Sequence, residues 1–249
     1  MSNKHLLIRN MLNFKSYYSS SKGNLYTCSD GKTTIIIDFG VSFKKAQVAL
    51  NFTMNKIDGA MSSHRHLDHC AGIPKALSMG MDCYLLPDTI NKLKVSGHRV
   101  HEMEPMKLFK IGTLKILPFP LEHDVPNVGF IIESETGGKL VYIVDTAYCK
   151  FRFKDVDIFA IEANYSKKIL DESIKSGVTP AFIKSRIMRS HFSLENVKEF
   201  FKANDLSAVK EIYLIHLSAN NICRKTAIRE IKELTGKPTF SFDKEGTNI

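Results

Sequence analysis

The stretch His64-Arg65-His66-Leu67-Asp68-His69 places four potential metal ligands within six residues. It directly follows the apolar run 57–62, which has the composition of a buried strand. Imidazole and carboxylate groups are natural ligands for zinc. Because a helix would scatter the four side chains around its axis, we expect residues 64–69 to form a loop. Chance histidines in a solvated loop are the alternative, which the chain's total of nine histidines disfavours.

Three further candidate ligands follow other apolar runs. His123 comes after the alternating run 114–119, Asp145 ends the run 140–144, and His216 ends the run 211–215. Four ligands are too few for two metal ions, so a binuclear site needs residues from elsewhere in the chain. A lone histidine or aspartate at a strand end is usually structural, and the prediction therefore depends on the combination.

The pattern HxHxDH, followed by His, Asp and His, resembles the metallo-β-lactamase superfamily over residues 64–216. That resemblance implies two Zn²⁺ ions per chain, or Mn²⁺ in their place. One ion would be held by His64, His66 and His123, the other by Asp68, His69 and His216, with Asp145 bridging them. Asp68 is also predicted to be essential for turnover. The lactamases of this superfamily tend to use a cysteine as a ligand in the second metal site. β-Lactam hydrolysis is therefore not expected here, because Cys70 and Cys149 neighbour the ligands without occupying a ligand position.

The resemblance implies an α/β fold, the αβ/βα sandwich of two mixed β-sheets with helices on the outer faces. The residues themselves predict strands at 33–38, 57–62, 114–119, 128–133, 140–144, 156–161 and 211–215. Residues 128–133 and 140–144 are expected to form a hairpin around Gly137-Gly138. Helices are expected at 74–79, after a Ser193 cap, and at 221–235, ending at Gly236. We find no repeat or linker, which indicates a single domain over residues 1–249.

His191 is the candidate general acid, and Glu162 is its candidate partner. The segment RSHFS at 189–193 resembles the transfer-RNA 3′-processing nucleases (RNase Z), in which the histidine donates a proton to the leaving oxygen. Glu162 resembles the acidic residue that orients this histidine in the same family. A carboxylate in that place fixes the tautomer and raises the basicity of the imidazole. The structural alternative is a surface histidine that caps the helix at Ser193.

Whole-chain similarity is closest to two groups, the YycJ/WalJ-like exonucleases and a phage set that includes the anti-Pycsar proteins, which degrade cyclic mononucleotides. Residues 38–45, 121–127 and 216–218 carry this likeness. It implies hydrolysis of 3′,5′-cyclic nucleotides to linear monophosphates by a metal-bridged hydroxide, as a phage or prophage counter-defence. The alternative is a 5′-exonuclease or an RNase Z-like nuclease on DNA or RNA. The stretch between Asp145 and His216 is too short for the large extra domain of β-CASP nucleases, which favours a small nucleotide.

Substrate and partner contacts are also expected by resemblance. Ser21 and Asn24 lie in a Ser/Gly stretch where backbone N–H groups could approach a phosphate, although a plain turn is the alternative. Ser218 and Asn220 follow His216 as further candidates, and Asn221 either contacts a nucleotide or caps the last helix. Apolar side chains of one segment either form a homodimer contact or cover the domain's own core: Ile169, Ile174, Phe182, Ile183, Ile187 and Met188.

The net charge of +9, from 35 basic and 26 acidic residues, favours anionic partners such as nucleotides or nucleic acid. A generic lysine-rich surface is the alternative, because the basic residues are dispersed. Five scattered cysteines without a CxxC pair argue against disulfides and for a reducing compartment. We see neither a membrane span nor, in residues 1–13, a secretion signal. A cytoplasmic location, in a bacterium or a phage-infected host, is therefore expected.

Overall fold

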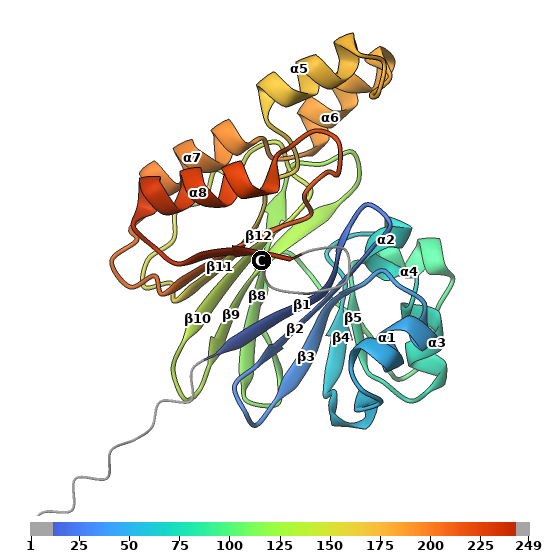
Figure 1. The fold of residues 1–249 in the computed structure, drawn as a ribbon. Helices are drawn as coiled ribbons and strands as arrows, with labels where there is room; N and C mark the ends of the chain where they lie inside the picture. The colour runs from blue at the N-terminus through green and yellow to red at the C-terminus, as the bar shows by residue number, and fades with distance from the viewer. Residues whose placement is uncertain (1–11, 243–249) are drawn as a thin grey trace, which may run out of the picture.

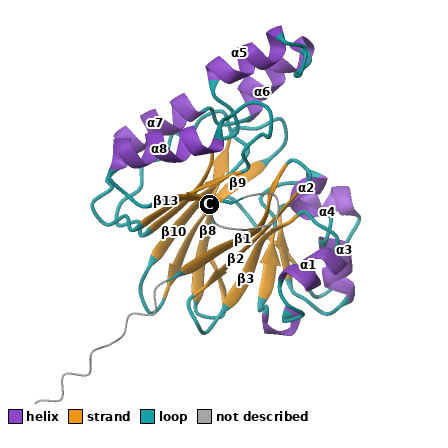
Figure 2. Ribbon diagram, viewed as in Figure 1, coloured by secondary structure: helices purple, strands orange, loops and turns teal. Residues whose placement is uncertain are grey.

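The computed structural model describes residues 12–242, and most of the stretch 1–13 lies outside them. Figure 1 shows two β-sheets packed against each other, with helices outside both. Figure 2 separates these layers by colour. Each sheet contains both parallel and antiparallel strand pairs. The prediction of a sandwich of two mixed sheets with outer helices is confirmed.

The first sheet comes from the N-terminal half of the chain. Its order is β1 (Asn13–Ser20), β2 (Gly23–Ser29), β3 (Thr34–Phe39), β4 (Gly59–Met61), β5 (Cys83–Leu85) and β6 (Val100–Glu102). The helices of this half are α1 (Phe43–Ala49), η1 (Met54–Lys56), α2 (Leu67–Cys70), α3 (Ile73–Ser78) and α4 (Pro87–Leu93).

The second sheet comes from the C-terminal half. Its order is β13 (Thr239–Ser241), β12 (Glu211–Ile215), β11 (Ile158–Glu162), β10 (Lys139–Ile143), β9 (Asn127–Ser134), β8 (Leu114–Leu121) and β7 (Phe109–Ile111). Its helices are α5 (Lys167–Lys175), η2 (Ala181–Ile183), α6 (Lys184–Ser190), α7 (Leu194–Lys202) and α8 (Arg224–Thr235).

Strand β3 shows why the sheets are buried on both faces. Ile35 and Ile37 belong to the apolar core between the sheets, whereas Ile36 belongs to the core beneath α1 and α3. Successive side chains of a strand point to opposite faces, so an unbroken apolar run fits a strand covered on both sides. Strand β11 behaves in the same way: Ala160 faces the inter-sheet core, and Phe159 packs beneath α7 and α8.

All seven predicted strands are present, with ends shifted by a few residues. The predicted hairpin is the antiparallel pair β9–β10, and Gly137 and Gly138 have φ angles of 102° and 100°. The Ser193 side chain accepts a hydrogen bond from the backbone N–H of Asn196, which confirms it as the cap of α7. Helix α8 ends at Gly236 as predicted, in a left-handed conformation.

Two local predictions are wrong. Helix α8 begins at Arg224, and Asn221 does not cap it, because its carbonyl accepts from Ser166 and its side chain accepts from Thr179. Residues 64–69 are not all loop, since Leu67–Cys70 forms the short helix α2. The Ser62 hydroxyl lies within donor distance of two carbonyl oxygens, 2.9 Å from that of His64 and 3.1 Å from that of His69. These contacts hold the two ends of the segment 64–69 close together.

Residues 167–190, here called the helical arm, contain α5, η2 and α6 and stand out from the sandwich in Figure 1. Phe182 is 85% exposed and Met188 is 42% exposed, so covering the domain's own core does not account for them. The homodimer contact stays a prediction. All five cysteines are free, and only Cys223 is exposed. Within residues 12–242, every helix is too short or too polar to cross a bilayer.

Candidate active site

The seven predicted metal ligands converge on one end of the sandwich. Their ligand atoms form two groups, and within each group these atoms lie within 4.8 Å of one another. The first group is His64, His66, His123 and Asp145, and the second is Asp68, His69, Asp145 and His216. Asp145 belongs to both groups, as expected of a bridging carboxylate.

Strand ends bring these side chains together. His123 follows β8, Asp145 follows β10 and His216 follows β12, so each enters the site from the same edge of the second sheet. Asp145 and His216 have left-handed φ angles of 48° and 52°. Such backbone is uncommon outside glycine and costs free energy, and it turns the chain sharply as each strand ends.

The residues present fit divalent cations. His216 Nε2 is a buried atom without a hydrogen-bond partner among the described residues, since the Oδ2 of Asp68 is 3.6 Å away. Buried polar atoms are normally satisfied, so this nitrogen, which points into the cluster, fits a site that another ligand completes. Imidazole nitrogens with carboxylate oxygens are donors that suit zinc and similar metals. The cluster can therefore bind metal.

The pKa values of the histidines in the cluster also fit metal binding. Burial holds the pKa of His64 well below its usual value, which favours the neutral form that ligates metals. Burial acts in the same direction on His216, but Asp145 outweighs it and raises the pKa of that ring well above its usual value. A binding cation would replace the proton on such a ring, because metal binding releases protons.

Asp38 positions a ligand of the second group, a role that the sequence did not reveal. Its Oδ2 lies 2.7 Å from His69 Nδ1 and accepts from the Tyr142 hydroxyl at 2.5 Å. Its Oδ1 accepts from the backbone N–H of Ser63 at 2.7 Å. With Nδ1 directed to Asp38, His69 presents Nε2 to the metal cluster, as expected of a ligand held by an outer carboxylate. The available signal was a carboxylate inside an otherwise apolar strand.

His191 and Glu162 lie beside Asp145, the predicted bridging ligand. His191 Nδ1 is 2.8 Å from Glu162 Oε1 and 3.1 Å from Asp145 Oδ1. Burial disfavours the charged ring, but Glu162 and Asp145 outweigh it and raise the pKa of His191 to about 9. Because Nδ1 of His191 is paired with these carboxylates, Nε2 is the ring nitrogen that can deliver a proton to a substrate. Ser193 itself caps α7, so the alternative role for His191 as that cap is wrong.

The four predicted substrate contacts have different surroundings. Ser21 is exposed in the turn between β1 and β2, and Asn220 is exposed after β12. Ser218 is half-buried, and its N–H donates to the Asn164 carbonyl. Asn24 is fully buried, and its amide nitrogen lies 3.0 Å from the Asp68 carbonyl and 3.2 Å from His69 Nε2. Asn24 therefore contacts two of the predicted metal ligands, and the substrate role of all four stays a prediction.

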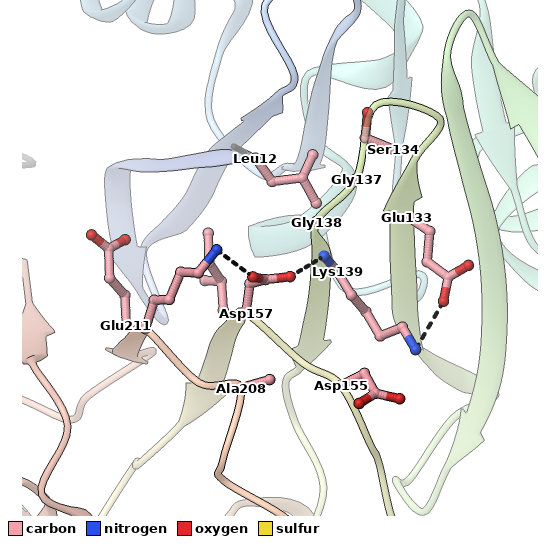
Figure 3. A pocket seen from close by; sticks show the side chains of 12 residues that line it. Leu12, Glu133, Ser134, Gly137, Gly138, Lys139, Asp155, Asp157, Ala208 and Glu211 are labelled. Atoms are coloured by element: carbon pink, nitrogen blue, oxygen red, sulfur yellow. Dashed lines mark hydrogen bonds and ion pairs between the residues drawn. The ribbon is translucent and has the colours of Figure 1, made fainter. Parts of the chain in front are cut away.

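A hollow of about 470 Å³ lies at the other end of the sandwich, where β10, β11 and β12 begin. Figure 3 shows Asp157 contacting two nitrogens and the Lys139 side chain reaching Glu133, whereas Asp155 and Glu211 lie apart from these pairs. Asp157 accepts from the Lys139 backbone N–H at 2.8 Å and pairs with Lys210 at 2.7 Å. The Lys139 ammonium pairs with Glu133 at 3.0 Å. The lining of the hollow includes none of the seven predicted metal ligands, so the hollow is not the candidate active site.

Known proteins resemble this chain over most of its length. The model of the β-lactamase superfamily domain matches residues 33–217. The exodeoxyribonuclease WalJ of Streptococcus pneumoniae is 29% identical over 84% of this chain and 82% of its own. The exodeoxyribonuclease YycJ of Bacillus anthracis is 24% identical over 92% of this chain and 91% of its own. The metallo-β-lactamase fold protein YhfI of Bacillus subtilis superposes with a TM-score of 0.70 at 15% identity, covering 96% of this chain and 99% of its own.

Proposed function

The chain belongs to the β-lactamase superfamily, and we propose that it is a zinc-dependent hydrolase of phosphodiester bonds in nucleic acid strands. The observation that carries the proposal is the pair of ligand groups that share Asp145, with His191 3.1 Å from the same carboxylate. Two adjacent cations with a proton donor beside them suit in-line displacement at phosphorus. The exonuclease relatives support a nucleic acid substrate.

Two Zn²⁺ ions, one in each ligand group, would activate the attacking water and neutralise charge on the phosphate. The chain's own part is to orient the ligands and to supply a proton. Asp38 orients His69, and Glu162 accepts from both His191 and His216 through one oxygen, at 2.8 Å from each Nδ1. The paired Nδ1 leaves Nε2 of His191 to protonate the leaving oxygen, whose departure as an alkoxide would otherwise be slow.

The proton donor can be tested with two leaving groups. In His191→Ala, hydrolysis of an oligonucleotide is expected to slow by about 10²–10⁴-fold, the usual contribution of a positioned acid. A nitrophenyl phosphodiester is expected to slow far less, because nitrophenolate leaves without a proton. Metal content, measured on each preparation, controls for loss of the cations. Equal losses on both substrates would reject the acid role of His191.

Hydrolysis of 3′,5′-cyclic nucleotides is the second candidate. The observation in its favour is the compact segment from β10 to β12, in which one strand, the helical arm and α7 supply all the regular structure. A panel of cyclic mononucleotides, cyclic dinucleotides and end-labelled DNA, offered to the zinc-loaded protein, separates the two. We expect the DNA to be cleaved at the higher rate. Faster hydrolysis of a cyclic mononucleotide would replace the strand substrate with the cyclic one.

A further inference from the structure

Arg186 lies next to the metal cluster without belonging to it. Its Nη2 is 3.7 Å from Oδ2 of Asp124. The other oxygen of Asp124 is 3.0 Å from His123 Nε2 and 3.4 Å from His66 Nε2. A single carboxylate therefore separates the Arg186 guanidinium from two ligands of the first metal group.

Helix α6 holds Arg186 in this place. The carbonyl oxygen of Ser190, at the end of α6, lies 3.1 Å from His123 Nδ1. Residues 186 and 190 are four apart and lie on the same face of the helix. The next residue, His191, is held by Glu162. The face of α6 that carries Arg186 is thus fixed against the loop that carries His123 and Asp124.

Arg186 differs from the other cations of α6 in its unused hydrogen-bonding capacity. Lys184 pairs with Asp171 at 2.6 Å, and Arg189 Nε donates to the Ser185 carbonyl. The contact of Arg186 with Asp124 is too long for a hydrogen bond. Its side chain is 69% exposed, so the donors of its guanidinium face solvent at the edge of the site.

We infer that Arg186 binds a phosphate next to the scissile one, an inference that rests on the proposed nuclease function. Asp124 stands between the guanidinium and the cluster, so the scissile phosphate itself is out of reach. A planar guanidinium binds phosphate oxygens in a bidentate manner and stays charged. The substrate class is then a strand with at least two phosphates, which a cyclic mononucleotide cannot supply.

The test compares a thymidine dinucleotide, which has one phosphate, with a thymidine trinucleotide, which has two. Wild type is expected to show a KM about ten-fold lower for the trinucleotide, as one charged contact provides. Arg186→Ala should abolish this preference by raising the KM for the trinucleotide to that for the dinucleotide, with kcat on the dinucleotide unchanged. Arg186→Lys should retain part of the preference. The matched control is Arg189→Ala, which removes the same charge from the same helix and should keep the preference.

Binding of a labelled oligothymidylate, followed by fluorescence anisotropy across salt concentrations, gives a readout that is independent of turnover. The plot of log affinity against log salt has a negative slope. Arg186→Ala should make this slope less steep by about 0.7, the value for one phosphate contact on a single strand. Equal weakening in the two alanine variants, or an unchanged length preference in Arg186→Ala, would overturn the inference. Arg186-dependent binding without cleavage by wild type would retain it and reject the proposed hydrolysis.

Discussion

Two buried aspartates lie towards opposite ends of strand β3, Asp38 within the strand near its end and Asp30 in the turn before its start, and their surroundings differ in one respect. Asp30 accepts from the backbone of Lys32 and Thr33 and from the hydroxyls of Thr113 and Ser134. Asp38 also accepts from backbone and hydroxyl groups, but it holds the imidazole of His69 as well.

Both carboxylates join the two sheets, because Ser134 and Tyr142 belong to the second sheet. Burying a carboxylate is costly unless hydrogen bonds replace the lost water, and both residues meet that condition. The difference is therefore in what each carboxylate orients. Asp30 orients turns, and its loss should affect folding alone, whereas Asp38 orients a metal ligand, and its loss should affect the chemistry.

Within this pair of aspartates, the largest expected effect comes from Asp38→Asn. The neutral amide keeps the shape but weakens the hold on His69 Nδ1, so zinc affinity and turnover should each fall about 10–100-fold. Competition with a chelating dye measures the affinity, and oligonucleotide hydrolysis measures the rate. Wild-type zinc affinity and rate in this variant would remove the distinction between the two aspartates.

How much of this could be predicted from sequence depends on how local the signal is. The cluster at 64–69 is recognisable because its ligands are neighbours, and Asp145 and His216 because each ends an apolar run. Asp38 also ends an apolar run, but its partners His69 and Tyr142 are distant in sequence, and the contact of Asp124 with Arg186 is equally non-local, so the sequence does not show what either aspartate orients. Strands β5 and β13 have three residues each, too few for periodicity to indicate them, whereas the equally short β4 lies within the longer run 57–62 that precedes the ligand cluster.

The matched substitution, Asp30→Asn, should lower the free energy of unfolding by about 1–3 kcal/mol at neutral pH. The reason is that a neutral amide cannot accept all four donated hydrogen bonds as a carboxylate does. Turnover per folded molecule should be unchanged, because Asp30 lies before the start of β3, at the opposite end of the strand from Asp38, and holds none of the predicted metal ligands. Urea denaturation gives the stability and a metal-saturated assay gives the rate. A zinc affinity reduced as in Asp38→Asn would show that the two ends of β3 are not independent.

The smallest expected effect is the change, in acid, of the stability difference between wild type and Asp30→Asn. Burial opposes ionisation of Asp30, but the bonds from Thr113, Thr33, Ser134 and Lys32 outweigh it and lower the pKa to about 2. An unfolded aspartate titrates near ~3.9. The ionised form therefore stabilises the fold fully above about pH 4, and this contribution is lost as pH falls towards 2. The difference in unfolding free energy between wild type and Asp30→Asn should shrink over that window. A difference that stays constant from pH 5 to pH 2 would mean that the hydrogen bonds to Asp30 do not depend on its charge.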